Sequence, residues 1–285
     1  MLLAVDVGNS HTVLAVFAAD RLAHHWRLRT ERAATADEIG SHVAGLLLFA
    51  GLQPTAVQGL VVGSVVPPLR AVWLEVAARH LRCPALAVEP GLPTGLRLEV
   101  ERPAEVGADR IADGLAAWRR HGAPAIVVDC GTATTVGAIA EGGRYLGGAI
   151  APGFGTSYDS LVTGAALLQR VELATPAAAL GRDTTAQMLS GLVFGFAGQV
   201  DSLVQRIALE MGGASHVIAT GGWAGTLVPV SRTVTVADPW LTLHGLRLIF
   251  EACGGSADQD LPAGSCPTRP NLGPVSAPAR QEGSS

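Results

Sequence analysis

The sequence predicts an α/β protein in which one structural unit occurs twice. The phrase AVDVGNSHT at residues 4–12 has a close counterpart, VVDCGTATT, at residues 127–135. Each phrase follows an apolar run, and apolar strand-like segments alternate with helix-like segments along most of the chain. The 35 glycines and the mean hydropathy of +0.35 are typical of buried strands joined by tight turns.

The first half of the chain is expected to begin with three strands. The run at 2–8, LLAVDVG, is apolar on both faces, as in a central strand covered by helices. The runs at 12–18 and 22–29 alternate like its antiparallel neighbours. The pattern then predicts, in order, a helix at 36–50, a strand at 57–63, a helix from residue 68 and a short strand at 85–88.

The same pattern restarts in the second half. Aligning Asp6 with Asp129 also aligns Gly8 with Gly131, Thr12 with Thr135, Val13 with Val136 and Ala15 with Ala138. Further elements are expected as helices at 156–168, 184–211 and 242–253 and as strands at 216–222 and 233–236. We therefore predict one lobe at 1–115 and a second at 116–253. The segment 254–285 is rich in Gly, Ser and Pro, and we expect it to be disordered.

Composition excludes several classes of function. The chain contains no lysine, which rules out a P-loop lysine and the strand lysine of a protein kinase. A net charge of -4 without a basic run disfavours nucleic-acid binding. Cys83, Cys130, Cys253 and Cys266 form no CxxC pair, so neither a zinc site nor a disulfide framework is indicated. Without a long apolar span or a basic leader, we expect a cytoplasmic protein with no membrane partner.

Each copy of the repeated phrase places a carboxylate at a tight bend. Gly8 lets the backbone approach a phosphate, and the side chains of Asn9, Ser10 and Thr12 can donate hydrogen bonds to it. Asp6 can face a phosphate only through a cation, which suggests hydrated Mg²⁺. A single bend of this kind is also ordinary hairpin chemistry. Two such bends in duplicated lobes would face each other across a cleft and could hold the β- and γ-phosphates of ATP.

This pair of bends, with the TGG at 220–222 after a late strand, resembles the actin, Hsp70 and sugar-kinase superfamily. The resemblance implies two duplicated ribonuclease-H-like (actin-like) lobes with a nucleotide cleft between them. It also implies that Gly221 and Gly222 lie near the adenosine, although a strand-to-helix turn would use the same glycines without a ligand. Within the superfamily, the order of the following segments resembles the type III pantothenate kinases over residues 1 to about 252: DVGNSHT, PAEVGADRIADGLAAW, VVDCGTATTVGAI, GGAIAPGF, GRDTTAQMLSGLVFGFAGQVDSLV and LTLHGLRLIFE.

The resemblance assigns roles to residues that match the family's motifs. Asp109 matches the general base, and Asp129 matches the ligand of a monovalent cation, K⁺ or NH₄⁺. ATP and phosphate contacts are implied for Asp6, Val7, Gly8, Asn9, Ser10, His11, Thr12, Val13, Gly131 and Thr132. Substrate contacts are implied for Val100, Gly107, Ala108, Asp109, Arg110 and Thr184, the last supplied by the neighbouring subunit of a homodimer.

Chemistry agrees with two of these roles. A carboxylate can accept the proton of an alcohol nucleophile, and the planar fork of Arg110 suits a substrate that carries a carboxylate. The alternative for Asp109 is an ion pair with Arg110 that caps the helix RIADGLAAW. One departure concerns Val100, because many members have tyrosine at this place, three residues before a proline.

The function implied by the resemblance is ATP-dependent phosphorylation of pantothenate to 4'-phosphopantothenate, the first step of coenzyme A biosynthesis, with Mg²⁺ and a monovalent cation. One alternative is a kinase of another small hydroxy acid or sugar. The other is a nucleotide-binding regulator of the same fold that has lost turnover.

Overall fold

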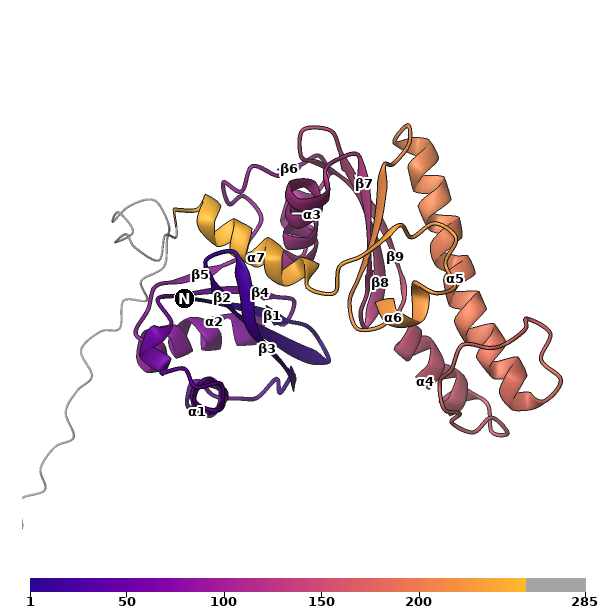
Figure 1. Cartoon of the computed structure of the whole chain (residues 1–285), viewed down its shortest axis with the longest axis horizontal. Coiled ribbons are helices and arrows are strands. Elements are labelled where there is room, and N and C mark those ends of the chain that lie inside the picture. Colours follow the sequence, from indigo (N-terminus) through magenta and orange to yellow (C-terminus); the bar gives the residue numbers. More distant parts are fainter. Residues whose placement is uncertain (255–285) are drawn as a thin grey trace, which may run out of the picture.

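A computed structural model describes residues 1–254 and contains two β-sheets, each covered by helices (Figure 1). The first sheet has the order β3-β2-β1-β4-β5, from β1 (Leu2–Val7), β2 (His11–Ala18), β3 (Arg21–Arg29), β4 (Gly59–Ser64) and β5 (Ala85–Ala87). The second has the order β11-β10-β7-β8-β9-β6, from β6 (Arg97–Leu98), β7 (Ala125–Cys130), β8 (Ala133–Ala140), β9 (Arg144–Pro152), β10 (His216–Thr220) and β11 (Val236–Ala237).

The two sheets repeat one topology. In each, the central strand is flanked by two successive antiparallel strands on one side and by two successive parallel strands on the other. The central strands β1 and β7 have the same burial pattern, with only the carboxylate position partly accessible. The short strand β6 is an addition that extends the edge of the second sheet beyond β9. The two sheets therefore share one strand order, as the predicted internal duplication requires.

Helices cover the outer face of each sheet. Against the first sheet pack α1 (Ala36–Phe49) and α2 (Pro67–Val76), with Trp73 fully buried among them. A capping box at Thr35 and Glu38 starts α1, since each side chain bonds the other's backbone N–H. Against the second sheet pack α4 (Phe154–Gly164), α5 (Thr184–Glu210) and α6 (Ala224–Leu227).

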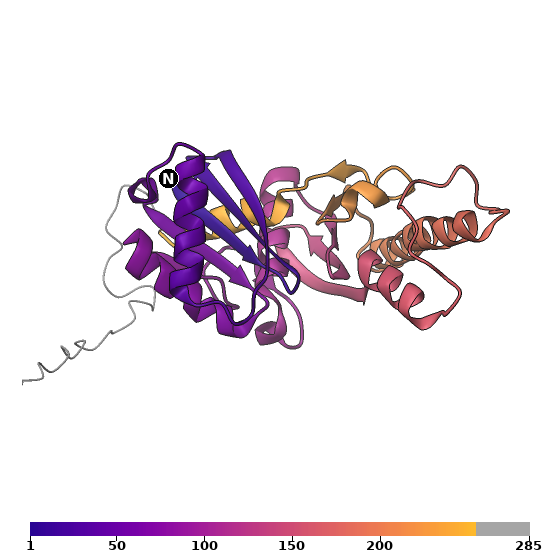
Figure 2. The same ribbon diagram turned by 90° about the horizontal axis from the view of Figure 1, so that it is seen from below.

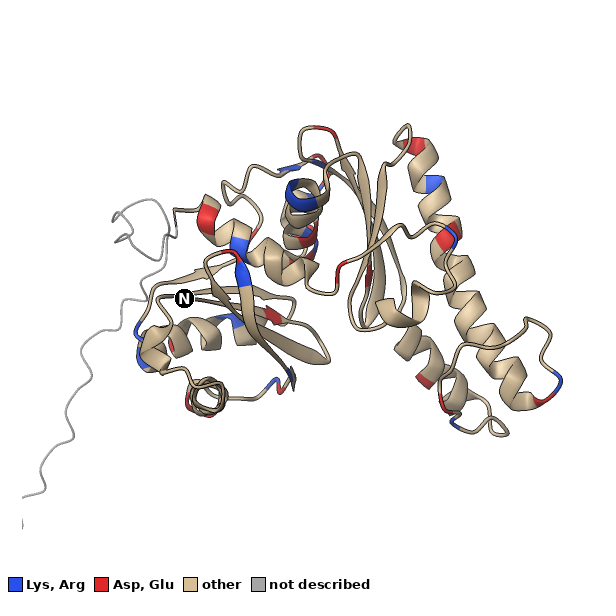
Figure 3. Cartoon of the chain, viewed as in Figure 1, with Lys and Arg blue, Asp and Glu red and all other residues tan. Residues whose placement is uncertain are grey.

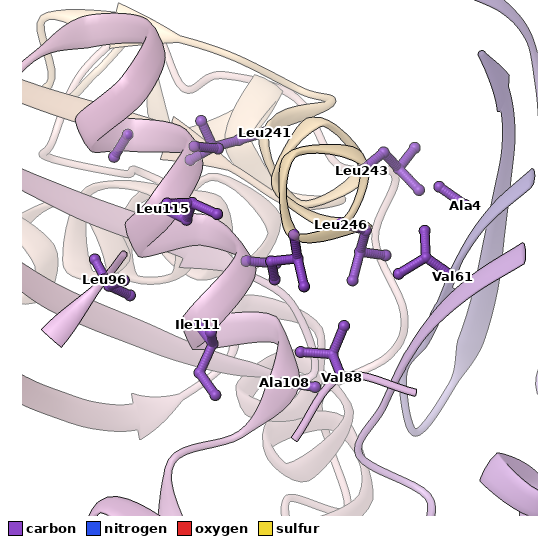
Figure 4. Packing of buried hydrophobic residues seen from close by; sticks show 14 of the residues in the cluster. Ala4, Val61, Val88, Leu96, Ala108, Ile111, Leu115, Leu241, Leu243 and Leu246 are labelled. Carbon is purple, nitrogen blue, oxygen red and sulfur yellow. The ribbon is translucent and has the colours of Figure 1, made fainter. Parts of the chain in front are cut away.

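The inner faces share one core, formed by two helices that lie between the sheets. Helix α3 (Ala108–His121) packs on β7 and β8, whereas α7 (Leu241–Ala252) packs on β1 and β4. Figure 4 shows Ile111 and Leu115 of α3 beside Leu246 of α7 in this core. The helices approach closely at Gly245, where a Cβ atom would overlap the Ala112 carbonyl. Figure 2 shows α7, in yellow, on the side of the first half of the chain.

Most of the predicted elements lie where the sequence pattern put them. The helix at 184–211 is α5, and the last helix at 242–253 is α7. The proposed boundary at residue 115 falls inside α3, and α7 from the second range packs on the first sheet. The predicted disordered tail, 254–285, lies outside the described residues except for residue 254. Among residues 1–254, no helix combines the length and the apolar character that crossing a membrane requires.

Candidate active site

The first bend joins β1 to β2 at the carboxyl end of the central strand. The Gly8 N–H donates to the His11 carbonyl over 3.0 Å and closes the turn. Thr30, just after β3, supports the turn from the side: its hydroxyl donates to the Gly8 carbonyl at 2.8 Å, and its N–H donates to the Ser10 carbonyl at 3.1 Å. The side chains of Asn9, Ser10 and His11 are left accessible.

The second bend joins β7 to β8 and is held differently. The Gly131 N–H donates to the Ala133 carbonyl over 3.0 Å. The Thr156 hydroxyl, at the start of α4, donates to the Thr132 carbonyl at 2.7 Å. Gly153 packs directly on this bend, because a Cβ atom there would overlap the carbonyl of Thr132 and lie 2.6 Å from that of Gly131. Close backbone packing therefore fixes the second bend.

The strand pairing corrects the sequence alignment of the two bends by one residue. Asp6 pairs with Val13, but Asp129 pairs with Thr135 and not with Val136. The second bend is one residue shorter. The alignment of the two phrases is therefore correct before the bend and one residue out of register after it. Val13 and Thr135 are the structurally equivalent positions, and both line the cleft described next.

The bends meet between the two sheets. Ser10 Oγ and Thr132 Oγ1 lie 3.0 Å apart in a hydrogen bond that joins one bend to the other. A cleft of about 1270 Å³ opens beside this contact. The predicted site residues that line it are Asp6, Gly8, Asn9, Ser10, His11, Val13, Asp109, Asp129, Gly131, Thr132, Gly221 and Gly222. Of the predicted first bend, Val7 and Thr12 are buried and are not among the residues that line it.

Three carboxylates in the cleft influence one another. Burial raises the pKa of Asp6 to about 8, with further contributions from Asp109 and Asp129. Burial and Asp109 raise the pKa of Asp129 to about 7. Asp113, one helical turn after Asp109, is also buried; burial raises its pKa well above the ordinary value, and its Oδ1 has no hydrogen-bond partner. The cleft thus holds more negative charge than the protein compensates.

This charge is suited to a bound cation. Within residues 1–254, no group of three or more His, Cys, Asp or Glu side chains could hold a metal ion alone. A Mg²⁺ ion usually takes one or two carboxylates and completes its shell with water and phosphate oxygens. The raised pKa values of Asp6 and Asp129 mark where a cation would relieve uncompensated charge. The residues therefore fit an ion that arrives with a phosphorylated ligand.

Asp109 and Arg110 lie in the first turn of α3. Gly107, not Asp109, is the N-cap, and the Asp109 Oδ1 accepts the Arg110 N–H at 2.8 Å. The Arg110 guanidinium donates to the Glu105 carbonyl at 3.0 Å. Gly107 has no room for a side chain, since a Cβ atom there would overlap the Asp109 carboxylate. Within residues 1–254, the structure contains no Asp109–Arg110 ion pair, so the alternative role of Asp109 is not supported.

A second cavity of about 450 Å³ adjoins the cleft at Thr135, which lines both. Val100 and Arg110 line it, together with Tyr145 of β9. The Tyr145 hydroxyl interacts with Arg110, while burial raises the pKa of the phenol. A ligand in this cavity would have Arg110 on one side and the larger cleft on the other.

The loop after β10 forms another wall of the cleft. Gly221 has φ of +87°, a conformation that glycine adopts without strain. A Cβ atom there would overlap Asp129 Oδ1 and lie 2.8 Å from the Cys130 backbone. The following Trp223 N–H donates to the Cys130 carbonyl over 3.0 Å. Gly221 is therefore required by its packing on the second bend, without any ligand.

Some predicted residues lie outside both cavities, and several residues that line the cleft were not predicted. Ala108 is buried at the start of α3, and Thr184, the first residue of α5, lines neither cavity. Sequence reasoning missed Thr135, because the alignment placed it one residue out of register. It also missed the cleft-lining side chains His25, Trp26, Arg27, Trp223 and Trp240, which stand at strand or loop positions without a motif. Asp113 was detectable as a carboxylate four residues after Asp109, on the same helix face.

Comparisons with known proteins identify one family. The model of the family described as type III pantothenate kinase matches residues 2–206. The type III pantothenate kinase of Moorella thermoacetica is 48% identical over 251 residues, which cover 88% of this chain and 99% of the relative. That of Brevibacillus brevis is 46% identical over 251 residues, covering 88% and 98%.

A solved structure supports the fold independently. Component A of (R)-2-hydroxyglutaryl-CoA dehydratase from Acidaminococcus fermentans superposes with a TM-score of 0.53 at 14% sequence identity, covering 88% of this chain and 98% of that one. This likeness concerns the fold alone, and it confirms the predicted class of two duplicated α/β lobes. Together with the family match, it confirms the resemblance noted in the sequence: the chain belongs to the type III pantothenate kinase family.

Proposed function

We propose that the protein transfers the γ-phosphoryl group of ATP to the terminal hydroxyl of pantothenate and so makes 4'-phosphopantothenate, the first step of coenzyme A biosynthesis. The observation that carries the proposal is the contact of the two bends, Ser10 to Thr132, beside a cleft that Asp109 also lines. Family membership supports the same reaction.

The triphosphate would lie along the two bends. Backbone N–H groups and the hydroxyls of Ser10 and Thr132 can donate to phosphate oxygens, and glycines at 8 and 131 leave room for close approach. Phosphoryl transfer requires little covalent chemistry from the protein, so positioning and charge stabilisation provide most of the rate enhancement. Gly221 and Gly222 would lie near the adenosine, in a loop whose Trp223 also lines the cleft.

Cations complete the charge balance. A Mg²⁺ ion bound with ATP at Asp6 would neutralise the phosphate oxygens during transfer. Asp129 is the proposed ligand of a monovalent cation, K⁺ or NH₄⁺. The buried carboxylates of the cleft support both assignments, since burial and the neighbouring Asp109 raise their pKa values and a bound cation would favour their charged forms.

The acceptor would occupy the smaller cavity. Arg110 can bind the carboxylate of pantothenate through its planar fork, while the hydroxyl end reaches Asp109 near Thr135. Asp109 would accept the hydroxyl proton as transfer proceeds. Val100 supplies an apolar wall to this cavity in place of the phenol of many relatives.

A homodimer would bring Thr184 to the neighbouring active site. The first part of α5, residues 184–200, carries no charged side chain, as its long tan stretch in Figure 3 shows. Gly191 and Gly195 on this helix are exposed, with open space where a side chain would stand. An uncharged face with accessible backbone supports close packing of a second copy. A cytoplasmic location without nucleic-acid or membrane partners stays part of the prediction.

The reaction is tested with purified protein, ATP, Mg²⁺ and pantothenate, with K⁺, NH₄⁺ or Na⁺ as the sole monovalent cation. We expect 4'-phosphopantothenate by mass spectrometry, with K⁺ or NH₄⁺ required. ADP release with a sugar or another hydroxy acid but not with pantothenate would identify a different kinase. ATP binding without any phosphorylated product would identify a regulator.

The role of Asp109 is tested by Asp109→Asn. We expect kcat to fall by about 10²- to 10⁴-fold, the usual contribution of a general base, with little change in ATP affinity. The matched control is Asp159→Asn, the same change at a cleft carboxylate that pairs with Arg170. Near-normal kcat in Asp109→Asn would refute the assignment.

A further inference from the structure

The cleft lacks an obvious counter-charge for a triphosphate. Its lining includes four carboxylates, on Asp6, Asp109, Asp129 and Asp159. No lysine exists in the chain to meet the phosphates. Among the described residues that line the cleft, Arg27 is the one arginine. Arginine is the side chain best suited to phosphate, since its planar fork donates two parallel hydrogen bonds.

Arg27 is available for such a ligand. It lies on β3, where it pairs with the cleft-lining Val13 of β2. Eight other arginines form ion pairs with carboxylates, at positions 29, 70, 79, 102, 120, 144, 170 and 247. Within residues 1–254, no carboxylate pairs with Arg27. Its charge therefore stays uncompensated at the edge of a strongly acidic cleft.

The Arg27 side chain reaches from the first sheet to the second. A Cβ atom placed on Gly222, in the loop after β10, would lie 2.9 Å from its Nη2 and 3.1 Å from its Nη1. The same guanidinium contacts the first bend, because Nη2 donates to His11 Nδ1 over 3.1 Å. Arg27 thus lies between the first bend and the loop proposed to hold the adenosine.

The hydrogen bond from Arg27 also determines which nitrogen of the His11 ring carries the hydrogen. A guanidinium can only donate, so His11 Nδ1 must accept, and the ring hydrogen is on Nε2. Burial lowers the pKa of His11, and Arg27 and Arg29 lower it further, which keeps the ring neutral. The first bend therefore presents a neutral N–H donor beside a fixed positive charge.

We propose that Arg27 binds the phosphate chain of the nucleotide and holds the first bend and the Gly222 loop together around it. This inference rests on the proposed nucleotide site. Bound phosphate replaces the missing anionic partner of Arg27, and the guanidinium completes the side of the cleft that the carboxylates leave without positive charge.

The test is calorimetric binding of ATP, ADP, AMP and adenosine, with Mg²⁺ and without pantothenate, to the full-length protein and its variants. In Arg27→Gln, we expect the dissociation constants of ATP and ADP to rise by about 10- to 100-fold, the usual worth of a charge-assisted hydrogen bond. Adenosine affinity should stay nearly unchanged. Arg27→Lys should lose an intermediate amount, since ammonium keeps the charge but not the fork.

The matched control is Arg29→Gln, on the same face of β3 but paired with Glu31 and absent from the cleft lining. It should bind all four ligands like the parent. Equal losses for ATP and adenosine in Arg27→Gln, or no loss at all, would overturn the role of Arg27.

A second variant separates this inference from the proposed site. Thr132→Val removes the hydroxyl of the second bend without touching Arg27. If Thr132→Val weakens ATP binding while Arg27→Gln does not, the site stands and the inference about Arg27 fails. If neither variant affects ATP binding, the nucleotide lies elsewhere and both proposals fail.

Discussion

The two bends share one repeated sequence pattern, yet they are held in different ways. The first is longer, is supported by the Thr30 side chain, and carries accessible polar groups; Arg32 donates to its Asn9 side chain at 2.9 Å. The second is one residue shorter and is enclosed by backbone, from Gly153 on one side and Gly221 on the other. The first bend therefore offers accessible side chains, whereas the second is fixed by close backbone packing.

The largest effects are expected from the two carboxylates that begin the bends. Asp6→Asn should lower kcat by about 10²- to 10³-fold, comparable to losing one preorganised electrostatic contact, and should raise the Mg²⁺ concentration needed for half-maximal rate. Asp129→Asn should instead reduce the stimulation by K⁺ or NH₄⁺. Steady-state kinetics with each cation varied in turn would show the difference. If the rates of the two variants depended on Mg²⁺ and on K⁺ or NH₄⁺ in the same way, the two carboxylates would not bind different cations.

Glycine substitutions compare the bends by stability. Gly221→Ala should destabilise the protein by about 2 to 5 kcal/mol, because the methyl group overlaps Asp129 and the backbone is left-handed. Gly8→Ala should cost clearly less, since its Cβ would meet only the His11 carbonyl, at 3.0 Å. Urea unfolding of both variants measures this. Equal losses would mean that the first bend is as tightly enclosed as the second.

The stability of the nucleotide-free protein should depend on pH because Asp6, at the first bend, is buried. The folded-state pKa of Asp6, about 8, lies above the unfolded value of 3.8, so proton binding stabilises the fold fully below pH 4. This stability is lost as pH rises toward 8. Thermal unfolding without divalent ions should therefore show a Tm that falls from pH 5 to 8.

The control for this pH effect is Asp6→Asn, which should make the fall in Tm shallower because the amide does not titrate, while Asp129 and Asp113, whose pKa values are also raised, keep part of it. Adding Mg²⁺ and ATP should raise Tm most at the alkaline end, where the carboxylates are charged. A parent protein whose Tm is constant over this range would contradict the raised pKa.

The smallest effect is expected at the contact that joins the bends. Ser10→Ala removes one hydroxyl of the Ser10–Thr132 hydrogen bond and should cost about 0.5 to 1.5 kcal/mol or less, because the site is exposed. ATP should then bind slightly more weakly, by a few fold. Ser10→Thr keeps the hydroxyl and serves as the control. Calorimetry on the pair decides whether the contact organises the site.

Sequence patterns predicted the repeated strands and the bend carboxylates because these depend on local order, whereas Asp109 was singled out by the family resemblance. Asp6 and Asp129 lie near the ends of β1 and β7, Asp109 lies in the first turn of α3, and all three line one cleft. The equivalence of Val13 and Thr135 was not predictable, since a bend shortened by one residue shifts the register without changing the letters. Arg27 has no motif, because its role depends on a loop almost 200 positions away reaching across from the second sheet.

The placement of α7 was likewise hidden, since nothing in residues 241–252 indicates which sheet the helix covers. Its position on β1 and β4 bears on how the protein is made. The first sheet is synthesised early but keeps an apolar face bare until its covering helix, near the end of the described chain, leaves the ribosome. Translation must therefore pass α7 before the early strands are fully covered, and nascent fragments that stop short of α7 are the species that chaperones would have to shield.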